Sequence, residues 1–196
     1  MDWRDIRQAG SKTVGGEDYD LTHLQDSVFS FSIAATKGCP EINADMLIQY
    51  SSHCVSIGPP HGERFDFAEL GMDQLVVDER GNERCFCPER YEWSKNLPDI
   101  IRTLPSDRVC FFTGHENWLT FEILDPAGVR HTYEVFFNLR RQSSKFVRVY
   151  VESGYVRTAD DEIRRPSDFR RQAKMRGKVL LAKKLRKQPI LAPRRR

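Results

Sequence analysis

The stretch YEVFFNLRRQSSKFVRVYVE, residues 133–152, decides the fold class of this chain. Apolar and aromatic residues fill both of its ends, and the polar residues Gln142, Ser143 and Ser144 lie between them. Two short segments rich in Val, Phe and Tyr around such a turn predict a pair of antiparallel strands. Residues 108–112 and 118–124 have the same character and precede the pair, which extends the prediction to an antiparallel meander.

Helices are expected before and after this meander in the sequence. Ser94 can cap a helix over residues 95–104, in which Pro98 is tolerated within the first turn. After residue 166, apolar residues recur at an imperfect helical spacing among basic ones. A meander sheet with a few helices predicts an α+β fold.

The first half of the chain gives weaker signals. Apolar residues alternate with small ones over 28–33, which predicts a strand, while Asn43 predicts the start of a helix that ends near residue 52. Residues 75–77 and 84–87 predict a hairpin. Residues 1–20 are polar and contain Gly15-Gly16, so we expect a mobile N-terminal arm before a core at 21–161.

Composition narrows the class of protein. Of the 196 residues, 39% are hydrophobic, yet the apolar runs are far shorter than the roughly 20 residues that a membrane-spanning helix needs. The five cysteines are scattered and odd in number, which argues against a disulfide framework, and their spacing does not favour a metal site. We therefore expect a cytoplasmic protein without a membrane segment, metal or other cofactor.

The C-terminal residues 162–196 carry fourteen Lys or Arg against two acidic residues. Such a basic block, predicted to be partly helical, is typical of segments that contact nucleic acid. The residues expected to make those contacts are Arg170, Arg171, Lys174, Arg176, Lys183, Lys184, Arg186 and Lys187. The alternative is a solvated basic helix that aids solubility.

Residues 84–160 resemble the barnase, colicin E5/D and RelE-like toxin superfamily. The resemblance lies in Pro88-Glu89-Arg90-Tyr91-Glu92-Trp93, a helix that ends near Pro105, an aromatic hairpin and a strand that begins at Tyr155 and ends in Thr-Ala.

Membership in this superfamily implies a metal-independent ribonuclease. That chemistry needs a group that accepts the proton of the ribose 2′-hydroxyl and cations that bind the phosphate. The candidate residues for these roles are His115, His131, Arg148 and Arg157.

A second resemblance lies in Gln25-Asp26-Ser27-Val28-Phe29, which is similar to the pentapeptide by which bacterial proteins bind the DNA sliding clamp. Gln25, Ser27 and Phe29 fit the pattern, whereas Val28 is smaller than the usual Leu and Asp26 departs from it. An extended peptide binds such a groove through a few anchors, here Val28 and Phe29. The alternative is that 28–33 is a strand with Phe29 in the core.

Together the toxin-like core and the clamp-binding peptide resemble the SocB-like replication-inhibiting toxins of atypical toxin-antitoxin systems. The resemblance implies a non-enzymatic toxin that competes with other proteins for the sliding clamp, and a cognate antitoxin that acts as a protease adaptor. The alternatives are a ribonuclease toxin and a nucleic-acid-binding module without toxicity.

Overall fold

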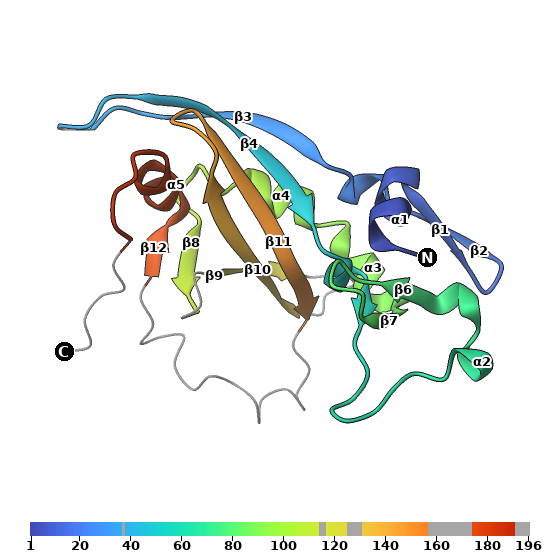
Figure 1. Cartoon of the computed structure of the whole chain (residues 1–196). Coiled ribbons are helices and arrows are strands. Elements are labelled where there is room, and N and C mark those ends of the chain that lie inside the picture. Colours follow the sequence, from blue (N-terminus) through green and yellow to red (C-terminus); the bar gives the residue numbers. More distant parts are fainter. Residues whose placement is uncertain (37, 114–116, 125–130, 157–173, 191–196) are drawn as a thin grey trace.

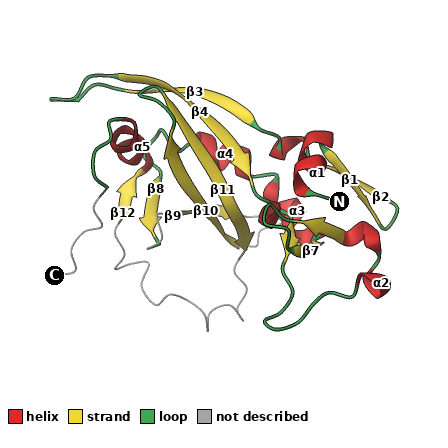
Figure 2. Ribbon diagram, viewed as in Figure 1, coloured by secondary structure: helices red, strands yellow, loops and turns green. Residues whose placement is uncertain are grey.

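The computed structural model describes residues 1–36, 38–113, 117–124, 131–156 and 174–190. Its largest element is a seven-stranded sheet (Figures 1 and 2). In spatial order the strands are β12 (Lys174–Arg176), β8 (Val109–Phe112), β9 (Asn117–Leu124), β10 (His131–Arg141), β11 (Phe146–Val156), β4 (Ile42–Tyr50) and β3 (Ser27–Ile33).

The meander predicted for β8 to β11 is confirmed, because each of these strands pairs antiparallel with the next. The sheet is nevertheless mixed, since β11 pairs in parallel with β4. A separate strand was expected over residues 155–158; its first two residues continue β11 instead, and residues 157 and 158 lie outside the described residues. With helices beside a mostly antiparallel sheet, the chain has the expected α+β fold.

Two smaller sheets lie at one end of the large sheet (Figure 1). The predicted hairpin forms part of a three-stranded sheet, in which β7 (Glu83–Phe86) lies between β5 (Ser56–Ile57) and β6 (Leu75–Val77). A separate hairpin joins β1 (Ser11–Val14) and β2 (Glu17–Asp20). The helices are α1 (Trp3–Ala9), α2 (Phe67–Leu70), α3 (Pro88–Ser94), α4 (Leu97–Arg102) and α5 (Gly177–Leu185), with short 3-10 turns η1 (Thr22–Leu24), η2 (Ser52–Cys54) and η3 (Met72–Gln74).

One face of the large sheet is buried in the hydrophobic core. Alternate residues of its central strands, such as Val135, Phe137, Val149 and Val151, are fully buried. They form one cluster with buried residues of α1, α3, α4 and α5. Because side chains of a strand alternate between faces, the intervening residues lie on the opposite face, here called the open face. No helix among the described residues is long and apolar enough to cross a membrane.

The expectation of a mobile arm at residues 1–20 is wrong. Asp2 caps α1 by accepting a hydrogen bond from the Arg4 backbone, and Trp3 and Ile6 are buried. The Trp3 indole donates to the Tyr50 backbone oxygen at 2.9 Å, which ties α1 to the large sheet. Gly15 and Gly16 both have positive φ and form the two-residue turn of the β1–β2 hairpin, a role that glycine pairs favour.

The C-terminal segment is not a separate tail over its described part. Its strand β12 extends the large sheet beside β8, and α5 buries Leu180, Leu181 and Leu185 in the core. Gly177 packs so closely against the Leu104 backbone that a β-carbon there would lie 2.2 Å from the carbonyl oxygen. Residues 174–185 are therefore part of the folded unit.

The helix expected from Asn43 is also wrong, because residues 42–50 form β4. Ala44, Met46, Ile48 and Tyr50 are buried while the residues between them are not, a period of two that fits a strand. The helix expected over 95–104 is shorter than predicted, since α3 ends at Ser94 and α4 begins at Leu97 with Pro98 in its first turn.

Candidate functional site

A cavity of about 790 Å³ lies over the open face of β10 and β11. Its remaining walls come from η2 and from the loop between β6 and β7. The lining residues are Ser51, His53, Asp78, Glu79, Arg80, Phe136, Asn138, Leu139, Arg140, Arg148, Tyr150, Glu152, Ser153 and Tyr155. They come from three separate parts of the sequence, and most of them are polar or charged.

A bulge in β11 shapes the floor of the cavity. Phe136 pairs with Ser153 and Phe137 pairs with Val151, so Glu152 is an extra residue between them. An extra residue breaks the alternation of a strand, which lets Glu152 and Ser153 both line the cavity. Glu152 is held there, since its carboxylate accepts a hydrogen bond from the Asn138 amide at 2.9 Å and its backbone oxygen accepts one from the Ser51 hydroxyl.

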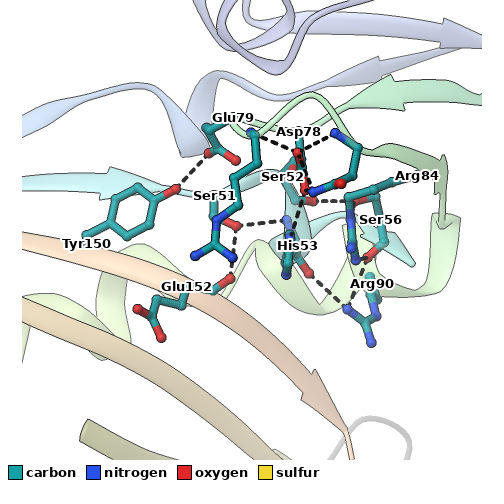
Figure 3. A network of polar contacts seen from close by, with 12 residues as sticks. Ser51, Ser52, His53, Ser56, Asp78, Glu79, Arg84, Arg90, Tyr150 and Glu152 are labelled. Carbon is teal, nitrogen blue, oxygen red and sulfur yellow. Dashed lines mark hydrogen bonds and ion pairs between the residues drawn. The ribbon is translucent and has the colours of Figure 1, made fainter. Parts of the chain in front are cut away.

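His53 is presented by the short turn η2, directly after β4. The Ser51 hydroxyl caps this turn by accepting a hydrogen bond from the His53 backbone N–H at 3.0 Å. On the far side, the Arg90 guanidinium donates to the backbone oxygens of His53 and Ser56, both at 3.0 Å (Figure 3). These contacts fix the backbone that carries the imidazole.

Asp78 lies opposite the His53 ring, with 3.7 Å between its carboxylate and the Nε2 atom. Burial alone would raise the pKa of Asp78, but hydrogen bonds from Asn82 and from the backbone N–H of Arg80 outweigh it and lower the pKa. Asp78 is therefore an ionised carboxylate held in a fixed position beside the imidazole (Figure 3).

Burial lowers the pKa of His53 below its ordinary value, and the nearby Arg84 guanidinium lowers it further, against the opposing effect of Asp78. The ring is thus neutral at pH 7. Its side chain keeps 41% of its surface exposed, so a ligand in the cavity can reach it. A neutral, oriented imidazole beside a carboxylate can accept a proton.

Tyr150 and Arg148 form a second cluster on the same floor. The Tyr150 hydroxyl donates to the Glu79 carboxylate at 2.7 Å, and burial followed by this hydrogen bond raises the pKa of the phenol, which stays protonated. The Arg148 guanidinium lies 5.0 Å above the Tyr150 ring. Directly across from Arg148 on β10 is Arg140, which is exposed.

The Arg148 guanidinium has unused hydrogen-bonding capacity. Its Nε atom is shielded from solvent, yet no atom of the described residues accepts a hydrogen bond from it. A buried donor without a partner is energetically costly. The described residues hold no group of three or more His, Cys, Asp or Glu suited to a metal ion.

The predicted ribonuclease residues separate in the structure. Arg148 lines the cavity. His131 begins β10 with its ring 5.1 Å from Trp93, and it is not among the cavity residues. His115 and Arg157 lie outside the described residues.

Sequence reasoning missed the cavity residues His53, Asp78 and Tyr150. Two local signals accompany the first two of them: a Ser-Ser-His run after the alternating residues 44–50, and an Asp at the start of a hairpin turn. Neither signal indicates that the two meet, because 25 positions of chain separate residue 53 from residue 78.

The Gln25–Phe29 segment lies at the edge of the large sheet. Gln25 follows η1, and residues 27–29 begin β3, which pairs with β4 alone. Val28 is 61% exposed, whereas Phe29 is half-buried against the core. Neighbouring strand residues point to opposite faces, so these two side chains do not present one continuous apolar surface.

The predicted nucleic-acid residues are spread over several elements. Lys174 and Arg176 lie on β12, Lys183 and Lys184 on α5, and Arg186 and Lys187 follow that helix. Arg176 forms an ion pair with Asp107 at 2.8 Å, and Arg186 donates to the Pro40 backbone oxygen at 2.7 Å. Arg170 and Arg171 lie outside the described residues.

Comparison with known proteins gives a family and no further relatives. Searches of curated proteins and of solved structures each found no significant match. A model of the YjaZ family matches residues 11–185, a span that includes the large sheet, α5 and every residue that lines the cavity. The chain therefore belongs to the YjaZ family.

Proposed function

We propose that the chain is a metal-independent ribonuclease whose active site is the cavity on the open face. The observation that carries the proposal is the placement of two guanidinium groups, Arg140 and Arg148, in the same cavity as the His53–Asp78 pair. A phosphodiester bound by these cations brings its ribose 2′-hydroxyl to a base. The toxin-like resemblance of residues 84–160 supports the same activity.

In this mechanism His53 acts as the general base. Its neutral imidazole accepts the proton of the 2′-hydroxyl, and the Asp78 carboxylate stabilises the imidazolium that forms. The 2′-oxygen bonds to phosphorus, and the bond from phosphorus to the 5′-oxygen breaks. The 5′-oxygen takes a proton from water, which leaves a 2′,3′-cyclic phosphate, and the resulting hydroxide removes the proton from His53.

Arg148 and Arg140 supply the positive charge for the phosphate. They lie on directly opposed positions of β11 and β10, so their guanidinium groups flank one part of the cavity floor. Negative charge grows on the phosphate oxygens as the 2′-oxygen attacks, and fixed cations stabilise that state more than the starting one. The stack of Arg148 on Tyr150 limits the orientations of its guanidinium.

The test is cleavage of single-stranded RNA by the purified protein in the presence of EDTA. We expect products that end in a 2′,3′-cyclic phosphate, no cleavage of the same strand made with 2′-deoxyribose, and a loss of about a hundredfold or more in rate for Arg148→Ala. Arg4→Ala, at an exposed position of α1, is the matched control. A wild-type protein that leaves RNA intact, or a folded Arg148→Ala variant with the wild-type rate, contradicts the proposal.

Sliding-clamp binding through Gln25, Ser27, Val28 and Phe29 is the second candidate function. It is supported by the 61% exposure of Val28 on an edge strand, together with the resemblance of the pentapeptide. Placing Val28 and Phe29 in one groove requires β3 to leave β4, because the two side chains face opposite ways in the paired strand. This added cost is why we rank clamp binding, and the replication-inhibiting toxin with its antitoxin, second.

A reversible cross-link tests the second candidate directly. Ser30 and Asp45 are opposed on β3 and β4, so Ser30→Cys with Asp45→Cys places two thiols at a separation suited to a disulfide. If clamp binding requires β3 to separate, the oxidised variant does not bind purified clamp, and reduction restores binding. The reduced variant is the matched control. Clamp binding that is equal in both states contradicts the requirement for strand separation, and no binding by wild-type protein removes the candidate.

A further inference from the structure

An aromatic stack lines the cavity at a distance from the two arginines. The Phe136 and Tyr155 rings lie nearly parallel, at an angle of 13° with 5.7 Å between their centroids. The Arg90 guanidinium lies 5.5 Å from the Tyr155 ring centroid. Arg90 also donates to the His53 backbone oxygen, so the stack and the proposed general base share one support.

The spacing along β10 separates this stack from the phosphate-binding end. Phe136 and Arg140 both point to the open face and are four residues apart, which corresponds to about 13 Å along a strand. Successive bases in a duplex strand are only about 3.4 Å apart along the helix axis. The distance from Arg140 to Phe136 therefore equals that of several stacked bases in a duplex. An extended single strand covers the same distance with fewer nucleotides.

We propose that the Phe136–Tyr155 pair binds an RNA base by stacking and thereby restricts the cavity to single-stranded RNA. The inference rests on the proposed ribonuclease function and names its substrate class. In a duplex each base is stacked between its neighbours and its flat faces are covered, whereas an unpaired base can turn its face to a protein ring. The polar groups of the cavity then hold the phosphate and ribose while the rings hold the base.

Binding without cleavage separates this role from catalysis. Fully 2′-O-methylated RNA lacks the attacking hydroxyl, so it can be titrated against the wild-type protein by fluorescence anisotropy as a single strand, as a duplex and as a single strand with one abasic position. We expect the single strand to bind about tenfold or more tightly than the duplex. Loss of one base–aromatic stack weakens binding by about 5- to 150-fold, so Phe136→Leu and Tyr155→Leu should each fall in that range.

The matched control is Phe65→Leu. Phe65 also packs against a second aromatic ring, Phe67, at 5.7 Å, but it does not line the cavity. The affinity of the Phe65→Leu variant for the single strand should equal that of the wild-type protein. The thermal unfolding midpoint of each variant is measured in parallel, and the abasic strand gives a test on the unaltered protein if a variant fails to fold.

The outcomes distinguish the two proposals. We expect the abasic position to weaken binding to the wild-type protein but to change the affinity of Phe136→Leu only slightly. This result would show that the missing base and the Phe136 ring contact each other in the complex. If wild-type protein cleaves RNA but binds duplex as tightly as single strand, or Phe136→Leu and Tyr155→Leu bind normally, the stacking role is overturned and the ribonuclease stands. If wild-type protein neither binds nor cleaves RNA, the ribonuclease proposal itself is overturned.

Discussion

The cavity and the Gln25–Phe29 segment lie on the same sheet and differ in how their residues are brought together. The segment is contiguous in the sequence, yet strand geometry turns its two apolar anchors, Val28 and Phe29, in opposite directions. The cavity draws His53, Asp78 and Arg148 from three distant parts of the chain into one place. Neighbours in sequence thus become separated, and distant residues become neighbours.

This difference shows what a short motif can establish. A pentapeptide pattern records residue types at fixed spacings, but binding depends on which side chains share a surface. That surface is set by the pairing of β3 with β4. The cavity, in contrast, is not predicted by any local sequence pattern. Its geometry depends on contacts between η2, the β6–β7 loop and β11, which lie far apart in the chain.

Replacement of His53 by Ala should have the largest effect on the cleavage rate, and it tests whether the cavity is the active site. Loss of a general base lowers the cleavage rate by about a hundred- to ten-thousandfold. His61→Ala, at an exposed loop position, and His131→Ala, outside the cavity lining, should cleave RNA at the wild-type rate. Rates are measured in EDTA, with circular dichroism to establish folding. Full activity in a folded His53→Ala variant contradicts the assignment of the cavity as the active site.

Replacement of Leu181 by Ala tests whether the basic C-terminal segment is an integral part of the fold. Leu181 is fully buried, so its truncation should lower the free energy of unfolding by about 2–5 kcal/mol. Val179→Ala, on the same helix with 40% exposure, should change it by less than about 0.5 kcal/mol. Urea denaturation measures both. Equal stabilities of the two variants would support a loosely attached tail in place of an integral helix.

Replacement of Asp78 by Asn should have an intermediate effect on the cleavage rate, about tenfold, because Asp78 orients and stabilises the base without contacting the substrate. The Asp78 charge raises the pKa of His53, so its removal lowers that pKa further. The base must be neutral, and the acid limb of the rate profile should therefore move to lower pH. A limb that stays in place or moves to higher pH contradicts the pairing of Asp78 with His53.

Replacement of Val28 by Ala should have the smallest effect on stability, less than about 0.5 kcal/mol in the free energy of unfolding, because the side chain is 61% exposed. Phe29→Ala should cost more, since Phe29 packs against the core. Urea denaturation of both variants measures the asymmetry between the two anchors. Equal losses would show that Val28 is also part of the packing and would remove the exposed surface on which clamp binding depends.

Several features of the fold follow from local pattern. The strands at residues 108–112, 118–124, 133–139 and 146–152 were predictable because apolar residues and turns follow one another at strand spacing. The strand at 28–33 and the hairpin around residues 78–83 were predictable for the same reason. The helix expected at Asn43 was wrong because a single capping residue was given more weight than the alternation of Ala44, Met46, Ile48 and Tyr50.

Other features depended on partners that lie far away in the chain. Residues 1–20 form a short and mostly polar segment. The segment is folded because Trp3 and Ile6 are buried in a core whose other residues come from strands later in the sequence. The basic block after residue 162 was expected to contact nucleic acid or, as the alternative, to form a solvated helix, yet three leucines among its described residues pack α5 against the core. For the proposed site, Arg148 was among the predicted residues, whereas the β11 bulge and the His53–Asp78 contact were not.

The α+β class and the positions of most strands follow from local sequence, because strand propensity and alternation act over a few residues. Which residues form the cavity, and which way Val28 and Phe29 point, follows from the tertiary arrangement. Those outcomes depend on strand order, on the parallel pairing of β11 with β4 and on one bulge at Glu152. Strand order and register depend on the burial of apolar side chains from the whole chain. This contribution to the free energy of folding is non-local, so a short segment cannot predict it.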